Sequence, residues 1–293
     1  MSNTDLIIEE RPRDIGDFLV GRLLPFRKKR MVGPFIFVDH MGPSVIKPGS
    51  YFDIGQHPHI GLSTLTYLFD GEIMHQDSLG TIQRVTAGSV GWMTAGKGIV
   101  HTERTPDDHR DGGSYPIHGF QIWVALPEHL EKMEPQFSYT DAKDVPSWSE
   151  NGNSFKLIAG KGFGRQSPVP VYSDLFLLEI NVDETTEFDI KDNLQGEIGI
   201  CVVDGSIDAC GQIVEKGSLL VSKEENACKL MVNAKSKLLI FGGQSFAEER
   251  FIDWNFVATD KEIIREAREN WHNKKFKMIP GDPSYIPLPS MAR

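Results

Sequence analysis

Two short histidine-containing segments stand out as candidate ligands for a metal ion. His57 and His59 are separated by a single proline, and His101 and Glu103 are separated by a single threonine. On an extended chain, residues two apart point to the same side, so each segment presents two donor groups on one face of a strand. The 41 residues between His59 and His101 can form several strands, so the two pairs can meet in one site.

Three imidazole nitrogens and one carboxylate oxygen form a donor set of intermediate softness. Such a set suits Fe(II), Mn, Ni, Cu and Zn. An octahedral ion held by four protein ligands would keep two open positions, which a substrate and dioxygen could use. The alternative for each histidine is a packed or hydrogen-bonded core residue, but two donor pairs with the same spacing favour a metal site.

The segments that must position these donors are predicted to be short β-strands. Runs of four to nine residues, rich in β-branched and aromatic side chains, are bounded by turn formers drawn from 28 glycines and 17 prolines. The pattern appears on both sides of a polar stretch near residue 140, which indicates two barrel-like β domains in tandem. One helix is predicted over residues 261–271, where Thr259 and Glu262 have capping-box spacing.

The histidines are unevenly distributed between the two halves of the chain. Eight of the nine lie in the first 129 residues, and none lies between residues 129 and 272. If the halves are related folds, only the first can hold a histidine-rich metal site.

Composition and charge exclude several classes of function. The 293 residues are 40% hydrophobic and 25% charged, as in an ordinary folded protein. The 31 Lys+Arg against 41 Asp+Glu give a net charge of −10, which argues against direct nucleic-acid binding. No apolar run approaches the roughly 18 residues of a membrane helix, and the polar N-terminus does not resemble a signal peptide, so no membrane partner is expected. Three cysteines, Cys201, Cys210 and Cys228, suit a reducing compartment, and we expect a cytoplasmic protein.

Longer segments resemble the pirins, a branch of the cupin superfamily. The likeness is carried by GPFIFVDHMGP, GQHPHIGLSTLTYLFDGEIMHQDSLG, WMTAGKGIVHTE and HGFQIWVALP, while FIDWNFVATDKEII and GDPSYIPLP are similar to the C-terminal part of bacterial pirin-like proteins. The resemblance implies an all-β fold of two tandem cupin barrels, also called jelly rolls or double-stranded β-helices, with a short C-terminal helix. We expect an N-terminal metal-binding cupin domain over residues 1–132 and a C-terminal cupin domain without a metal site over residues 133–293.

The resemblance also implies one bound divalent metal ion, with Fe(II) favoured because pirins typically bind iron. The pirin metal motif falls on His57, His59, His101 and Glu103, the four residues selected by spacing. Several pirins resemble flavonol dioxygenases, which implies a quercetin 2,3-dioxygenase-like oxidoreductase that acts on a small aromatic substrate and O2, with Glu103 as general base. The alternative is a non-enzymatic, redox-sensing module that acts through an unidentified protein partner, as the eukaryotic member of the family does.

Overall fold

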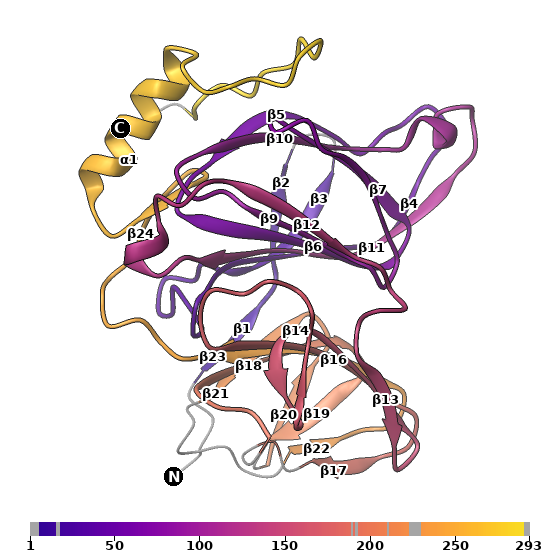
Figure 1. The fold of residues 1–293 in the computed structure, drawn as a ribbon. Helices are drawn as coiled ribbons and strands as arrows, with labels where there is room; N and C mark the ends of the chain where they lie inside the picture. The colour runs from indigo at the N-terminus through magenta and orange to yellow at the C-terminus, as the bar shows by residue number, and fades with distance from the viewer. Residues whose placement is uncertain are drawn as a thin grey trace. The chain divides into compact units, whose positions relative to one another are not determined.

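The structure, a computed structural model, describes residues 6–15, 18–188, 190, 193–209, 211–222 and 230–289. These residues form β-strands in most of their length, together with one α-helix, α1 (Lys261–His272), and 3-10 turns at Asp107–His109 and Glu128–Leu130 (Figure 1). The predicted all-β class with a short C-terminal helix is therefore confirmed. No helix within these ranges is long and apolar enough to cross a membrane.

The chain divides into two compact units, each built from segments far apart in the sequence. The histidine unit comprises Asp14–Leu19, Met41–Tyr139 and Ala247–Arg293, and the second unit comprises Met1–Arg13, Val20–His40 and Thr140–Phe246. The expected domain boundary between residues 132 and 133 stays a prediction. The compact units do not follow this boundary. Most of the N-terminal segments belong to the second unit, whereas the C-terminal segment with α1 belongs to the histidine unit.

Two antiparallel sheets face each other in the histidine unit. The four-stranded sheet has the order β5-β10-β7-β8, made of β5 (Asp53–His59), β10 (Ile99–Arg104), β7 (Glu72–Asp77) and β8 (Ile82–Thr86). The other sheet contains, in the order β12-β9-β6-β11, the strands β12 (Gln136–Thr140), β9 (Val90–Thr94), β6 (Leu62–Asp70) and β11 (Tyr115–Ala125). A hydrogen bond from Thr66 on β6 to Glu103 on β10 shows that the two sheets face each other.

Strand β5 lies at the edge of its sheet, which explains why a proline is tolerated between its two histidines. Pro58 has no N–H to donate to a ladder, and such residues are confined to edge strands. The turn after β5 requires Gly61, whose φ is +68°, because an added Cβ would lie 1.9 Å from the carbonyl oxygen of Val257. The neighbouring carbonyl of Ile60 accepts the N–H of Val257 at 3.2 Å, so the end of β5 is fixed against β25 (Phe256–Ala258).

Helix α1 packs on the short hairpin of β24 (Phe251–Asp253) and β25. Its N-cap is Asp260, whose side chain accepts the backbone N–H of Glu262 at 2.9 Å. The predicted cap, Thr259, is wrong by one residue, because its hydroxyl donates instead to Glu131 at 3.0 Å. The buried face of the helix consists of Ile264, Ala267 and Trp271.

The second unit has its own sheets and its own apolar core. Its large sheet has the order β1-β21-β18-β23-β16-β14-β13, with β15 paired to β14, and a smaller sheet has the order β17-β22-β19-β20. The core includes the fully buried Leu178, Ile200 and Ile240. Cys201 is a buried free thiol, whereas Cys210 and Cys228 lie outside the described residues.

The remaining strand bounds complete the chain order. They are β1 (Leu6–Glu9), β2 (Arg11–Asp14), β3 (Leu19–Leu24), β4 (Phe35–Ile46), β13 (Ser147–Glu150), β14 (Asn153–Gly162), β15 (Arg165–Gln166), β16 (Leu175–Val182), β17 (Thr186–Phe188), β18 (Glu197–Asp204), β19 (Ser206–Ala209), β20 (Gln212–Glu215), β21 (Ser218–Ser222), β22 (Leu230–Val232) and β23 (Ser236–Gly243). Strand β4 passes from the second unit into the histidine unit at Met41.

Candidate metal centre

Three of the four predicted ligands meet on the neighbouring strands β5 and β10. His57 pairs directly with His101 in the antiparallel register. The ring centroids of His57 and His101 are 4.3 Å apart, and those of His59 and His101 are 5.0 Å apart. One ring nitrogen from each of the three histidines lies within 4.8 Å of the corresponding nitrogens of the other two. The structure therefore brings these side chains together, and their role as metal ligands stays a prediction.

The hydrogen-bond pattern of the three rings fits a metal ion. Nδ1 of His57 donates to the carbonyl oxygen of Gly55 at 2.8 Å, which leaves a lone pair on Nε2. Nε2 of His101 and Nδ1 of His59 are buried and have no hydrogen-bond partner among the described residues, although the Asn255 backbone hydrogen-bonds to the His59 ring. A buried polar atom without a partner costs about 1–3 kcal/mol, and a metal ion bound to these nitrogens would remove that cost.

Burial keeps the three imidazoles neutral at pH 7. It lowers the pKa of His57 to about 4, against a smaller opposing effect of the Gly55 carbonyl. Burial also lowers the pKa of His59 and that of His101 well below 6.5, and the neighbouring His57 adds to both shifts. Because a proton and a metal ion compete for the same nitrogen lone pair, low pKa values leave these nitrogens available to a metal at neutral pH.

Glu103 is buried on β10, two residues after His101, but it is not part of the group of three close nitrogens. It is 4% exposed, and Thr66 Oγ1 donates a hydrogen bond to its Oε1 at 3.0 Å. Burial raises the pKa of Glu103, against smaller lowering effects of His75 and Thr66. The carboxylate is therefore more basic than an ordinary glutamate, and its role as the fourth ligand stays a prediction.

Two further residues beside the histidines were not selected as site residues from the sequence. His75 on β7 lies with its Nδ1 3.5 Å from Nδ1 of His101 and its Nε2 3.1 Å from Oδ2 of the fully buried Asp77. Its ring stacks on Phe137, with centroids 4.3 Å apart. Asp77 thus orients His75 against His101. The signal for this pair was present in the sequence, since His75 and Asp77 have the same two-residue spacing as the predicted ligands.

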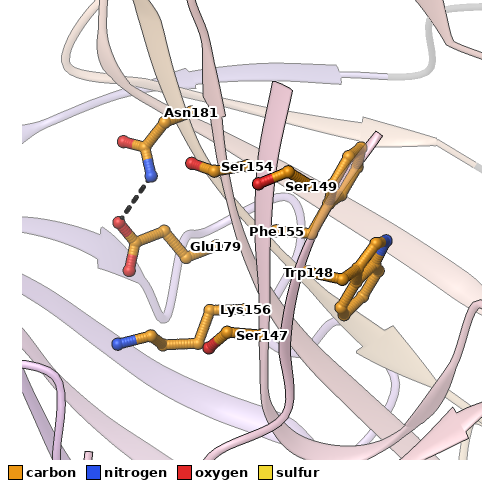
Figure 2. Close-up of a pocket in the computed structure, with 8 residues that line it drawn as sticks. All are labelled: Ser147, Trp148, Ser149, Ser154, Phe155, Lys156, Glu179 and Asn181. Atoms are coloured by element: carbon orange, nitrogen blue, oxygen red, sulfur yellow. Dashed lines mark hydrogen bonds between the residues drawn. The ribbon is translucent and has the colours of Figure 1, made fainter. Parts of the chain in front are cut away.

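A cavity of about 380 Å³ lies in the second unit and has a different character. It is lined by the stacked rings of Trp148 and Phe155, by Lys156, and by Glu179 with Asn181, whose amide donates to the Glu179 carboxylate at 3.0 Å. Figure 2 shows these side chains around the cavity, with the tryptophan and phenylalanine grouped on one side. No histidine lines it, so it does not contribute donors of the kind found in the histidine unit.

Comparison with known proteins places the chain in a family. The pirin family model matches residues 18–124, and the model of the pirin C-terminal cupin domain matches residues 177–277. A pirin-like protein from Caulobacter vibrioides is 38% identical, over 97% of this chain and 99% of that protein.

Solved structures agree with this assignment. A quercetin 2,3-dioxygenase from Acinetobacter baumannii is 33% identical with a TM-score of 0.89, covering 98% of this chain and 95% of that chain. A bacterial pirin from Escherichia coli, solved in complex with nickel(II), has the same fold, with 21% identity, a TM-score of 0.65, and coverage of 82% of this chain and 99% of that chain. The chain therefore belongs to the pirin family and consists of two cupin domains.

Proposed function

We propose that the protein is a metal-dependent dioxygenase of the pirin type that opens a flavonol such as quercetin with O2. The observation that carries the proposal is the convergence of three buried, neutral imidazoles on β5 and β10. The 33% identity to the quercetin 2,3-dioxygenase from Acinetobacter baumannii, over nearly the whole chain, supports the substrate class. The sparse cysteines support a cytoplasmic setting for this reaction.

The proposed ligands are His57, His59, His101 and Glu103. One divalent ion is expected, most readily Fe(II), although the same donor set also accepts Mn, Ni, Cu and Zn. The orphaned nitrogens of His59 and His101 support their part in this set, because both are buried without another partner within the described chain. When bound, the metal would act as a Lewis acid that lowers the pKa of a coordinated hydroxyl group.

Glu103 is proposed to act as the general base. Its buried carboxylate has a raised pKa, so it takes a proton more readily than an exposed glutamate. Thr66 donates to Oε1 of Glu103 and thereby fixes the orientation of the carboxylate, which leaves Oε2 as the atom that would accept the proton of the substrate hydroxyl. The rings of Trp123 and His59 lie at 79° to each other with centroids 5.0 Å apart, and Trp123 would help to exclude water from the donor group.

The test is the aerobic decay of the near-ultraviolet and visible absorption of quercetin. Metal-free protein is expected to be inactive, and reloading with Fe(II) or with another divalent ion is expected to restore turnover. His101→Ala should lose both metal and turnover, whereas Glu103→Gln should keep part of the metal and lose rate. The exposed His129 provides a matched control, since His129→Ala should leave metal content and rate unchanged.

Two results would exclude the proposed reaction. Full activity in protein whose metal content is zero by elemental analysis would show that the histidine group is not involved. Absence of decay with several flavonols, in protein that carries one metal per chain, would show that the site has another role.

A further inference from the structure

The segment after α1 returns along the outer edge of β5. This segment begins with the sequence GDPS at residues 281–284 and passes beside Gln56. Gln56 lies on β5 and directly precedes His57. In Figure 1 the C-terminal segment lies next to β5 and β10. We call Asp282, Ser284 and Ile286 the C-terminal clasp.

Gln56 forms the first half of the contact with this segment. It is fully buried, and its backbone N–H donates to Ser284 Oγ at 3.0 Å while its carbonyl accepts the N–H of Ile286 at 2.9 Å. Its side-chain amide donates to the carbonyls of Asp282 and Ser284 at 2.8 and 3.1 Å and accepts the N–H of Ile279 at 2.7 Å. The edge of β5 is therefore bonded to the clasp through both the backbone and the side chain of one residue.

Arg104 on β10 forms the second half. It directly follows Glu103, and its Nη2 donates to Ser284 Oγ at 2.9 Å and lies 2.7 Å from Oδ2 of Asp282. Ser284 Oγ is consequently shared between β5 and β10, the two strands that carry the predicted ligands. A single hydroxyl thus joins the strand of His57 and His59 to the strand of His101 and Glu103.

The clasp binds β5 where its pairing with β10 is irregular. The register changes between the pairs His101–His57 and Glu103–Ile54, so one extra residue of β5 is accommodated at Gly55 and Gln56. A bulge of this kind redirects the side chains next to it. Gly55, within the bulge, supplies the carbonyl that accepts Nδ1–H of His57. The position of this carbonyl therefore determines which nitrogen of His57 is left for a metal.

We propose that the C-terminal clasp is a positioning element for the metal centre: it holds the β5 bulge and the β10 strand in the geometry in which His57 and His101 bind one ion. The inference rests on the proposed metal site. Removal of the groups that surround and orient metal ligands typically lowers metal affinity by about 10–100-fold. Loss of the Ser284 hydroxyl should accordingly weaken metal binding without abolishing it.

The C-terminal segment is also anchored to α1 by contacts that do not involve the Ser284 side chain. Tyr285 stacks on Trp271 of α1 with centroids 4.6 Å apart, and its hydroxyl donates to the Trp271 carbonyl at 3.1 Å. The indole N–H of Trp271 donates to the carbonyl of Ile286 at 2.9 Å. Ser284→Ala should therefore remove the hydroxyl that joins the two strands while the segment stays docked on α1.

The experiment titrates metal-free protein with Co(II), whose visible absorption reports the geometry of its ligands. Ser284→Ala and Arg104→Met are each expected to raise the Kd for Co(II) about 10-fold and to alter its spectrum, and the double variant should add little because both changes break the same link. Ser149→Ala, at an exposed serine of the second unit, is the matched control. Wild-type affinity and an unaltered spectrum in Ser284→Ala would overturn the inference, since a purely structural role would lower only the stability.

A second measurement separates the clasp from the proposed function. Amide hydrogen exchange in the metal-free protein should become faster at Gln56, His57 and His59 in Ser284→Ala, while exchange in α1 stays unchanged. If wild-type protein binds no Co(II), the proposed metal site fails and the positioning role of the clasp fails with it. If wild-type protein binds Co(II) but exchange at these three amides is unchanged in Ser284→Ala, the metal site stands and the clasp is refuted.

Discussion

Removal of the metal should make the histidine unit sensitive to mild acid. The three imidazoles are buried in neutral form, whereas in the unfolded chain each takes up a proton near its ordinary pKa of about 6.5. Between pH 6.5 and the folded pKa values, the unfolded state therefore binds more protons than the folded state. The contribution of the neutral imidazoles to the free energy of unfolding is therefore present above pH 6.5. It falls as the pH is lowered, because protonation favours the unfolded chain.

The magnitude for His57 follows from its folded pKa of about 4. The pKa of His57 is about 2.5 lower in the folded protein than in the unfolded chain, which limits the loss in free energy of unfolding to about 3 kcal/mol at and below pH 4. At pH 5, where the unfolded imidazole is almost fully protonated and the folded one is not, the loss from this residue is about 2 kcal/mol. His59 and His101, whose pKa values are also lowered by burial, act in the same direction.

Urea unfolding of metal-free protein at pH 7.5 and at pH 5 measures this effect. With an m-value of about 2 kcal/mol per molar urea, His57 alone contributes a fall of about 1 M in the unfolding midpoint. His57→Gln removes the titrating group and should reduce the fall by that amount, whereas His129→Gln, at an exposed position, should not change it. An equal fall in the wild type and in His57→Gln would refute the reasoning, as would a midpoint that does not depend on pH.

Three other perturbations have defined outcomes. Asp77→Asn should weaken Co(II) binding about 10–100-fold, because the amide offers an N–H to His75 Nε2 in place of an acceptor and so disturbs the ring that contacts His101. Asp108→Asn, at an exposed ion pair, is the control. Equal Co(II) affinity in Asp77→Asn and in the wild type would count against this role of Asp77. Thr66→Val removes the hydroxyl that lowers the pKa of Glu103, so the acidic limb of the pH–rate profile should move to higher pH, and an unshifted limb would argue against Glu103 as the base. Asp260→Ala removes the N-cap of α1 and should lower the free energy of unfolding by about 1 kcal/mol, measured by urea denaturation. Thr259→Ala, at the cap position predicted from the sequence, is the comparison variant.

The sequence contained enough to select the three histidines that meet. Their spacing is a local property, because the two-residue period of an extended chain puts His57 and His59 on one face whatever the rest of the fold does. The alternation of apolar runs with glycine and proline likewise predicted short strands and a single C-terminal helix, since turn chemistry and periodicity act over a few residues. Only the cap of that helix was misplaced, by one residue, because Thr259 has a tertiary partner in Glu131.

The residues around the histidines depended on contacts that spacing cannot reveal. Asp77 reaches the site through the pairing of β7 with β10, and Thr66 reaches Glu103 from the facing sheet. Ser284 lies 228 residues after Gln56 along the chain and yet bonds to it. Each of these contacts is set by strand register and by the path of the chain within the histidine unit. Local sequence therefore determined which side chains could bind a metal, and the tertiary structure decided which groups hold them in place.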